Sequence, residues 1–361
     1  MSIPDKISIS RMQLSDMDAI LAFLAENFPD NPRQSNRKFW MWHYVDHPNS
    51  HPGEIPIWIA KSNERIAGQL ATIPVELNVG STTVPAIWIL DLMVDPEFRR
   101  RGIMKRLVLE AQKQFPFMLA TASTRQHSAA MFKGLGWTVF SRVPRYHRPL
   151  FPGHAVKEIS RLAPVRAFAN IIFAPFRPSK GQMARASTQV RPVTKFDSQF
   201  DDLAEQCRRR SPCSIRHSAT YLKWQFEDQP LKKYEVLGYY EGNQLKGYVT
   251  VFFRRASAGG FIDKAAISDI CYHPDFASKV VDILILAALD LAVARRAGGL
   301  VTDVMDALLE DRLKYFGFWP IKSEIEIMAI GPEGNDIMYD PSNWYLTRGD
   351  SDISIFEDPN L

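Results

Sequence analysis

The sequence predicts a mixed α/β protein with two consecutive domains, each a central mixed β-sheet flanked by helices. Three observations predict this fold class. The 361 residues, 46% of them hydrophobic, are enough for two domains with ordinary cores. Short runs of alternating apolar residues are interspersed with runs of helical periodicity, and a series of motifs recurs about 180 residues later. We place the first domain at residues 1–152, an apolar and basic linker at 153–187, and the second domain, with an aromatic and acidic tail, at 188–361.

The internal repeat is the strongest of these observations, because five matches occur in the same order at nearly constant spacing. Residues 42–48 correspond to residues 224–230, with a tryptophan, an aromatic residue and a proline at the same positions. The other matches pair Gly68 with Gly247, residues 91–96 with 269–274, Phe98 with Phe276, and residues 135–137 with 316–318.

In the first copy, the patterns predict strands at residues 7–11, 55–60, 68–79, 86–94 and 117–122, where apolar residues alternate between turn residues. Helical periodicity predicts helices at residues 16–27, 37–45 and 126–135, and a further helix that starts at Ile103. A terminal hairpin is expected near residues 139–150. The second copy runs in the same order from about residue 189 to residue 331.

The segment from Leu92 to Met104 has the chemistry of a phosphate-binding loop. An apolar strand end is followed by Arg99, Arg100, Arg101 and Gly102, and then by the apolar helix. The first backbone amides of a helix have no intrahelical partner and lie at the positive end of the helix dipole. Glycine at the helix start lets the backbone approach an anion closely. The alternative is a solvated basic loop.

This segment resembles the acyl-CoA signature of the GNAT superfamily of N-acetyltransferases, in which Gln or Arg, two variable residues, Gly, a variable residue and Gly or Ala bind the pyrophosphate. Arg99 and Gly102 match, whereas Met104 stands where a small residue is usual. Residues 129–137 are similar to the helix and the Leu-Gly-aromatic turn that close a GNAT domain. The resemblance implies a tandem GNAT protein that uses acetyl-CoA or another acyl-CoA as co-substrate. The implied cofactor-binding residues are Leu92, Met93, Val94, Arg99, Arg100, Arg101, Gly102, Ile103, Met104 and Arg125, the last of which contacts the cofactor or caps the following helix.

The second copy departs from the signature at this loop. Ala277, Ser278, Lys279 and Val280 stand in place of residues 99–102, and Asp282 stands in place of Met104. A carboxylate beside a phosphate would oppose binding. We therefore expect one acyl-CoA site, in the first domain, and a degenerate second copy.

Two residues are candidates for catalysis. Asp91 is an ionisable residue in an otherwise apolar strand, where a raised pKa would suit a general base; a structural role is the alternative, because Asp269 repeats it in the degenerate copy. The tyrosine acid that the resemblance implies is replaced by Phe132. Tyr146, in the terminal hairpin, is the substitute candidate, with an ordinary hairpin aromatic as the alternative.

Acceptor-binding candidates are Trp42, which either lines a pocket or belongs to the core, and Asp350 and Asp352, which either attract a cationic amine or belong to a solvated turn. We expect the acceptor in the cleft between the copies. His43 and His47 lie four residues apart but have no third ligand in sequence, so no metal is expected.

The expected function is transfer of an acetyl or short acyl group to a primary amine, with an amino sugar of a bacterial polysaccharide pathway as the first acceptor candidate by fold-level analogy. The alternatives are an aminoacyl or long-chain N-acyl transferase and a non-catalytic acyl-CoA-binding or scaffold protein.

A net charge of +4 gives no reason to expect nucleic acid. Three cysteines and the lack of an export signal favour a cytoplasmic protein. The linker at 162–176 either packs across the domains or touches a membrane surface.

Overall fold

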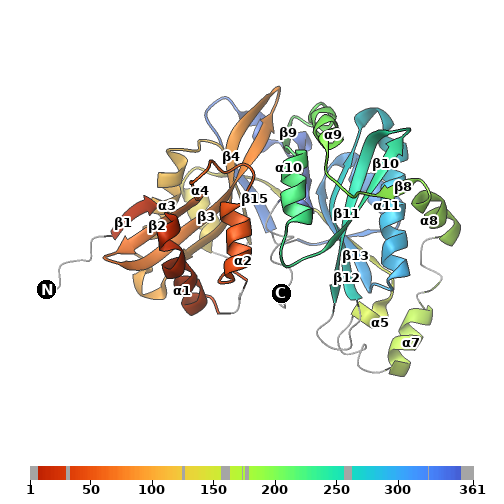
Figure 1. The fold of residues 1–361 in the computed structure, drawn as a ribbon, viewed down its shortest axis with the longest axis horizontal. Coiled ribbons are helices and arrows are strands. Elements are labelled where there is room, and N and C mark those ends of the chain that lie inside the picture. Colours follow the sequence, from red (N-terminus) through yellow and green to blue (C-terminus); the bar gives the residue numbers. More distant parts are fainter. Residues whose placement is uncertain are drawn as a thin grey trace.

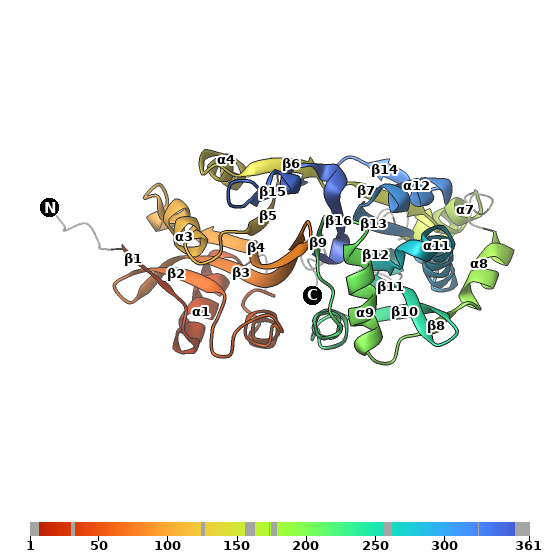
Figure 2. The same cartoon turned by 90° about the horizontal axis from the view of Figure 1, so that it is seen from above.

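A computed structural model describes residues 7–29, 33–123, 127–155, 163–172, 174, 179–255, 262–323 and 325–350. It consists of two lobes that lie side by side, each a twisted sheet with helices on its faces (Figures 1 and 2). In the described part of the chain, sixteen strands form one connected sheet that runs through both lobes. The predicted fold class is confirmed.

The first lobe contains the predicted strands and helices nearly as expected. Strands β1 to β4 are antiparallel neighbours, and β4 pairs with β5 in parallel. Alternate residues of β3 and β4 are buried on opposite faces of the sheet, where one face packs on α3 and the other on α1. The strands are β1 (Ile7–Arg11), β2 (Ile57–Ser62), β3 (Arg65–Val79), β4 (Thr82–Val94), β5 (Met118–Ser123) and β6 (Thr138–Arg142), and the helices are α1 (Met17–Asn27), α2 (Arg37–Trp40), α3 (Ile103–Gln112) and α4 (His127–Gly134).

The second lobe repeats this order. Strands β8, β10, β11 and β12 are antiparallel neighbours, and β12 pairs with β13 in parallel. Asp197 and Asp306 cap the first turns of α9 and α12 through their carboxylates. The strands are β8 (Val190–Pro192), β10 (Tyr234–Glu241), β11 (Gln244–Arg255), β12 (Ile262–Tyr272), β13 (Gly299–Met305) and β14 (Trp319–Ile321), and the helices are α9 (Ser198–Arg208), α10 (Ala219–Leu222), α11 (Ala277–Ala294) and α12 (Ala307–Tyr315).

The lobes exchange one strand each. Strand β7 (Arg145–Pro149) leaves the first lobe and pairs with β13 and β14 of the second. Strand β15 (Ile325–Ile330) makes the reverse crossing and lies between β5 and β6. The expected terminal hairpin at residues 139–150 is therefore wrong, because β6 pairs with β15 in the first lobe and β7 pairs with β13 and β14 in the second. The boundaries at residues 152 and 188 likewise do not separate the two sheets.

The lobes are also joined by a bridge of two short strands and by an aromatic contact. Strand β9 (Cys213–Ile215) pairs with β3, and β16 (Trp344–Thr347) pairs with β9 and β13. Trp42 and Trp224, equivalent positions in the repeat, stack with ring centroids 4.8 Å apart. Each indole Nε1 donates to the backbone oxygen of the other tryptophan, at 2.9 and 2.8 Å. The repeat therefore contacts itself about an approximate twofold axis.

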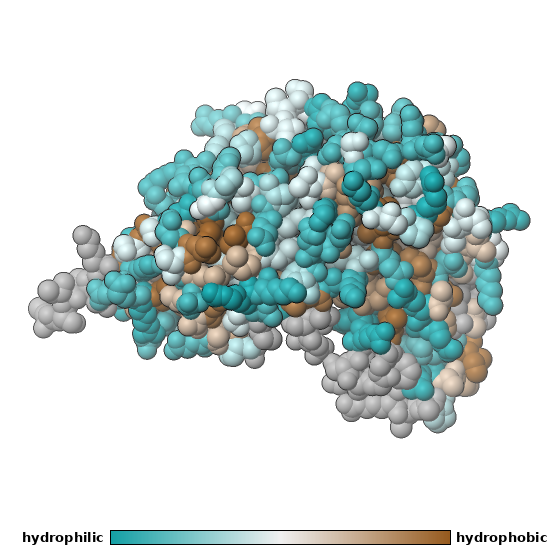
Figure 3. Space-filling model, viewed as in Figure 1, coloured by the Kyte–Doolittle hydropathy of each residue, from teal (hydrophilic) through white to brown (hydrophobic). Residues whose placement is uncertain are grey.

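The linker folds onto the second lobe. Its helices are α5 (Pro152–Ala155), α7 (Ala163–Ile172) and α8 (Lys180–Ser187). Helix α8 packs on α11, and α5 packs on α7 and β12. Hydrophilic side chains cover most of the face drawn in Figure 3. In the described ranges, we find no helix that is long and apolar enough to span a membrane.

Candidate functional site

A gap opens between β4 and β5 in the first lobe. The two strands pair from Ile87 opposite Met118 to Ile89 opposite Ala120, while β4 continues to Val94 and β5 to Ser123. A β-bulge lies at the point of divergence, because Ala71 faces Asp91 and Thr72 faces Ile89, with Leu90 left between. The bulge bends β4 away from β5, so the backbone of Leu92, Met93 and Val94 borders an opening rather than a paired strand.

The basic loop follows the end of this opening strand. Asp95 caps a short 3-10 turn by accepting from the Glu97 amide at 2.8 Å, and Arg65 binds the Asp95 carboxylate at 2.7 Å. Gly102 then has a left-handed φ of 71°, and α3 begins at Ile103. The first backbone hydrogen bond of α3 runs from the Arg106 amide to the Gly102 carbonyl. The amides that precede it point out of the helix start, as an anion site requires.

The loop has room for a phosphate group. A Cβ added at Gly102 would meet no heavy atom of the described residues within 4 Å beyond its chain neighbours. Arg99, Arg100 and Arg101 are exposed around it. Met104, which departs from the family pattern, is partly buried against the hydrophobic cluster beneath α3. Its side chain therefore packs on the core and leaves the helix start open.

Asp91 lies at the mouth of the gap, one residue after the bulge. Its side chain is buried, and it accepts hydrogen bonds from Gln34 at 2.7 Å and from the Tyr44 hydroxyl at 3.3 Å. Burial raises the pKa of Asp91 to about 6, and it outweighs the opposing effect of the two hydrogen bonds and of the Arg33 charge. The carboxylate is thus ionised at neutral pH and able to accept a proton.

The equivalent residue of the second lobe, Asp269, has a different environment. His217 lies 3.2 Å away, and the Tyr248 and Thr347 hydroxyls donate to the carboxylate at 2.6 and 3.0 Å. Burial opposes ionisation, but the charge of His217 and these hydrogen bonds lower the pKa of Asp269. Asp269 therefore belongs to a closed ion-pair network within the protein.

In its described residues, the second lobe has no counterpart of the basic loop. The 3-10 turn Pro274–Phe276 leads directly into α11 at Ala277, so the position equivalent to Gly102 lies within the helix. Lys279 pairs with Glu241 at 2.7 Å, and Arg312 binds Asp282 through two hydrogen bonds of 2.6 and 2.7 Å. The two charged side chains at the loop-equivalent positions, Lys279 and Asp282, are thus each paired with an opposite charge from another element of the second lobe.

Tyr146 does not lie near Asp91, so the prediction that it reaches the first-lobe site is wrong. The strand exchange carries it into the core of the second lobe, where its hydroxyl donates to Glu310 at 2.5 Å. Tyr44 is the tyrosine that contacts Asp91. Sequence reasoning missed Gln34, which belongs to no motif, and did not connect Tyr44, the aromatic residue of the repeat at 42–48, with Asp91, because both precede β4 by many residues.

The acceptor candidates have structural partners. Trp42 is buried in the contact with Trp224 described above. Asp350 has neither of the roles expected from the sequence: it is buried, its Oδ1 lies 2.6 Å from His217 Nε2, and its Oδ2 accepts from the Thr347 amide. Two carboxylates outweigh the effect of burial and raise the pKa of His217 well above its usual value. Arg125 and Asp352 lie outside the described residues.

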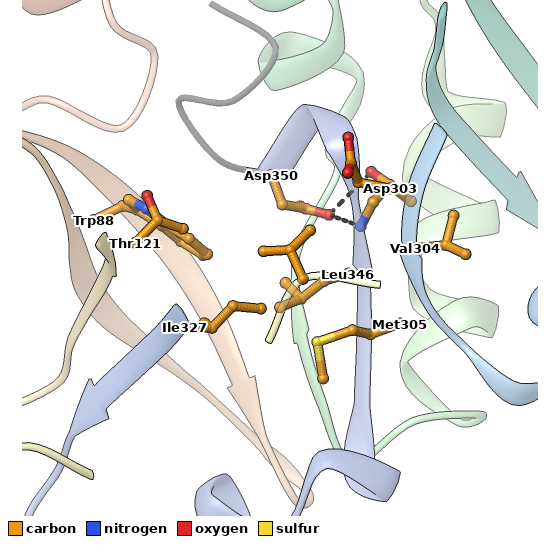
Figure 4. Close-up of a pocket in the computed structure, with 10 residues that line it drawn as sticks. Trp88, Thr121, Asp303, Val304, Met305, Ile327, Leu346 and Asp350 are labelled. Atoms are coloured by element: carbon orange, nitrogen blue, oxygen red, sulfur yellow. Dashed lines mark hydrogen bonds between the residues drawn. The ribbon is translucent and has the colours of Figure 1, made fainter. Parts of the chain in front are cut away.

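A narrow hollow lies between the lobes, close to the base of the gap. Trp88, Thr121 and Ile327 line it from the first sheet, and Asp303 and Met305 line it from the second (Figure 4). It holds about 280 Å³ of empty space. The dashed lines in Figure 4 end on the Asp350 carboxylate, which is turned toward its own backbone segment. Most of the other lining side chains are apolar.

Comparisons with known proteins agree with this geometry. The sequence profile of the acetyltransferase (GNAT) domain matches residues 8–138. A search of the curated proteins found no match. Among solved structures, Saccharomyces cerevisiae N-myristoyltransferase with bound myristoyl-CoA has a TM-score of 0.59 at 13% identity, covering 91% of this chain and 84% of that one.

Two bacterial structures are similar to the same extent. A probable N-acyltransferase from Enterococcus faecalis has a TM-score of 0.59 at 15% identity and covers 92% of this chain and 74% of that one. A GCN5-related N-acetyltransferase from Anabaena variabilis has a TM-score of 0.58 at 12% identity and covers 90% and 72%. Identities this low show a common fold, which here extends over both lobes. Residues 8–138 therefore match the acetyltransferase (GNAT) domain, and both lobes together share the fold of these N-acyltransferase structures.

Proposed function

We propose that this chain is an N-acyltransferase that takes an acyl group from acyl-CoA at one site, in the first lobe. The observation that supports this most is the alignment of three features along one strand: the gap beside β4, the helix start at Gly102 and the buried Asp91. The exposed arginines would bind the phosphates of CoA, and the backbone of Met93 and Val94 would hold the pantetheine arm.

Asp91 is the proposed general base. The neutral amine of the acceptor attacks the thioester carbonyl, Asp91 accepts the amine proton, and the CoA thiolate leaves and takes a proton from solvent. Gln34 and Tyr44 orient the carboxylate through their hydrogen bonds. A pKa of about 6 suits this role, because the group is ionised at neutral pH and remains basic enough to take a proton.

We propose an acetyl or other short acyl group as the donor. Trp88 of β4 is paired with Leu119 of β5, one residue before the last pair of the two strands. Both side chains are fully buried. The hollow beyond them is small. A long acyl chain is the alternative, suggested by the likeness to N-myristoyltransferase, and competition between acetyl-CoA and myristoyl-CoA distinguishes the two.

The proposed acceptor is a primary amine on a polar molecule, with an amino sugar as the first candidate. Polar groups occur on the elements that adjoin Asp91: among the described residues, the Oε1 atoms of Gln34 and of Gln69 on β3, and both ring nitrogens of His43, next to Tyr44 in the chain, are buried without a hydrogen-bond partner. Groups of this kind are normally satisfied by water or ligand. A hydroxyl-rich acceptor would supply the missing partners.

Calorimetric titration with acetyl-CoA tests the cofactor site. We expect one equivalent per chain for the parent and no binding for Gly102→Glu, which places a carboxylate where phosphate would bind. The matched control is Gly242→Glu in the β10–β11 turn, since Gly242 also has a positive φ and an open Cβ position. Two equivalents per chain, or equal binding by Gly102→Glu, would contradict the proposal.

Turnover is then measured by release of free CoA thiol with a panel of primary amines that includes glucosamine. Release that depends on an amine and is lost in Asp91→Asn supports the transferase. Binding of acetyl-CoA without turnover over the whole panel would instead favour a non-catalytic acyl-CoA-binding protein.

A further inference from the structure

Helix α7 presents an apolar face to solvent. Nine large hydrophobic side chains are exposed among the described residues, and four of them lie on this ten-residue helix. They are Val165, Phe168, Ile171 and Ile172, with Phe168 66% and Ile171 69% exposed. At 3.6 residues per turn, the four lie within an arc of about 120°. Hydrophobic side chains also gather at the lower right edge of Figure 3, where α7 lies in Figure 1.

The opposite face of α7 is anchored on the second lobe. Asn170 is buried and accepts a hydrogen bond from the Gly153 amide at 2.9 Å. Gly153 packs so closely on the backbone of Arg166 that a Cβ at this position would clash with it. The apolar face is therefore held outward by the contact between α5 and α7.

The net positive charge of the protein is concentrated in the stretch of sequence that contains this helix. Residues 153–187 contain six lysines and arginines and one acidic residue, whereas the rest of the chain has 38 basic and 39 acidic residues. Arg166 and Arg296 line a hollow beneath α7 that holds about 910 Å³ of empty space. An exposed apolar face beside a positive surface is the combination that binds an anionic bilayer.

We propose that α7 docks this protein on membranes that contain anionic lipids, with its apolar face inserted and the basic residues around it in contact with lipid phosphates. This inference is independent of the proposed transferase activity. The membrane is favoured over a protein partner because an exposed apolar face and an excess of basic residues occur in the same segment, and the net charge of the chain outside this segment is −1.

Flotation of the full-length protein with vesicles of phosphatidylcholine and phosphatidylglycerol tests the proposal. We expect binding at about 0.1 M salt that weakens at higher salt, and little binding to vesicles of phosphatidylcholine alone. The double substitution Phe168→Ser and Ile171→Ser should lower the partition coefficient at least tenfold. Lys180→Glu, at the exposed start of α8, should weaken binding to the anionic vesicles only. The matched control is Leu14→Ser, which removes an exposed leucine from the first lobe and should leave binding unchanged.

Failure of the parent protein to float, or equal flotation of the double variant, would overturn the proposal. The main alternative is that a second copy of this chain covers the apolar face of α7. Size-exclusion chromatography with light scattering, without lipid, tests this alternative by measuring the molar mass. We expect the protein to be a monomer under these conditions. A dimer that the double variant converts to a monomer would assign α7 to self-association instead. Acetyl-CoA binding and the circular dichroism spectrum of each variant show whether it is folded.

Discussion

Asp91 and Asp269 occupy equivalent positions in the two lobes, and their replacement by asparagine should have opposite effects on stability. The folded-state pKa of Asp91 is about 6, above the ordinary value of 3.8. For a carboxyl group whose pKa is raised by folding, the free energy of unfolding falls as pH rises from the unfolded to the folded pKa. At 1.36 kcal/mol for each unit, the ionised carboxylate lowers the stability of the protein by roughly 3 kcal/mol above pH 6.

Asp91→Asn removes this cost, while its amide oxygen can still accept from Gln34 and its amide nitrogen can donate to the Tyr44 hydroxyl oxygen. The variant should be more stable than the parent at pH 8, and the difference should shrink by roughly 2 kcal/mol on going to pH 4.5, where the parent carboxyl is protonated in the folded state. Turnover should fall by about 10² to 10⁴-fold, the usual contribution of a general base. Urea titrations at the two pH values and initial rates of thiol release give both quantities.

Asp269→Asn is the matched comparison. Folding lowers the pKa of Asp269, so its carboxylate contributes stability above the unfolded pKa, which is lost as pH falls through the folded value. Removing one partner of this buried network should cost about 3–5 kcal/mol at pH 8. A destabilised Asp91→Asn with unchanged turnover would refute the assignment of Asp91 as base and favour a structural carboxylate.

Three further predictions concern the rest of the chain. Trp42→Ala should lower the free energy of unfolding by about 3–5 kcal/mol in a urea titration, because a buried stacked ring is lost, whereas Trp319→Ala at an exposed edge should change it by less than about 0.5 kcal/mol. Tyr44→Phe should reduce turnover and shift its acid limb to higher pH, since Asp91 loses a hydrogen bond to its ionised form, while Tyr146→Phe should leave the pH profile of the rate unchanged. Gly102→Ala should lower stability by about 1–2 kcal/mol in thermal unfolding, because its φ of 71° is costly for alanine, and an unaffected variant would show that the loop adopts another conformation.

The sequence predicted the local structure well where periodicity and turn residues agree. Strand β1 has the predicted bounds, and β3, β4 and β5 differ from the predicted ranges by only a few residues at their ends. The position of the basic loop before α3 could be predicted because its residues are contiguous. Asp91 could be singled out because it is an ionisable residue in an apolar strand, although its partners Gln34 and Tyr44 could not be identified.

Residues 139–150 show why the rest could not be predicted. Two short strands separated by a turn indicate a hairpin, and nothing local shows that β6 and β7 pair with different sheets. The same exchange removed Tyr146 from the site. The contact of Cys207 with Cys271, at 2.6 Å between sulfur atoms, also joins α9 to β12 over 64 residues of chain.

The sequence by itself determined that there are two copies of one fold, that only the first has a basic loop at a helix start, and that each copy has a carboxylate on its fourth strand, before the position of that loop. These features depend on short stretches of chain and on the repeat. The tertiary structure alone decided what each carboxylate does. Asp91 and Asp269 hold equivalent positions in the repeat, but His217 and the segment of Asp350 pair with only the second, so burial raises the pKa of one carboxyl while a nearby positive charge lowers that of the other.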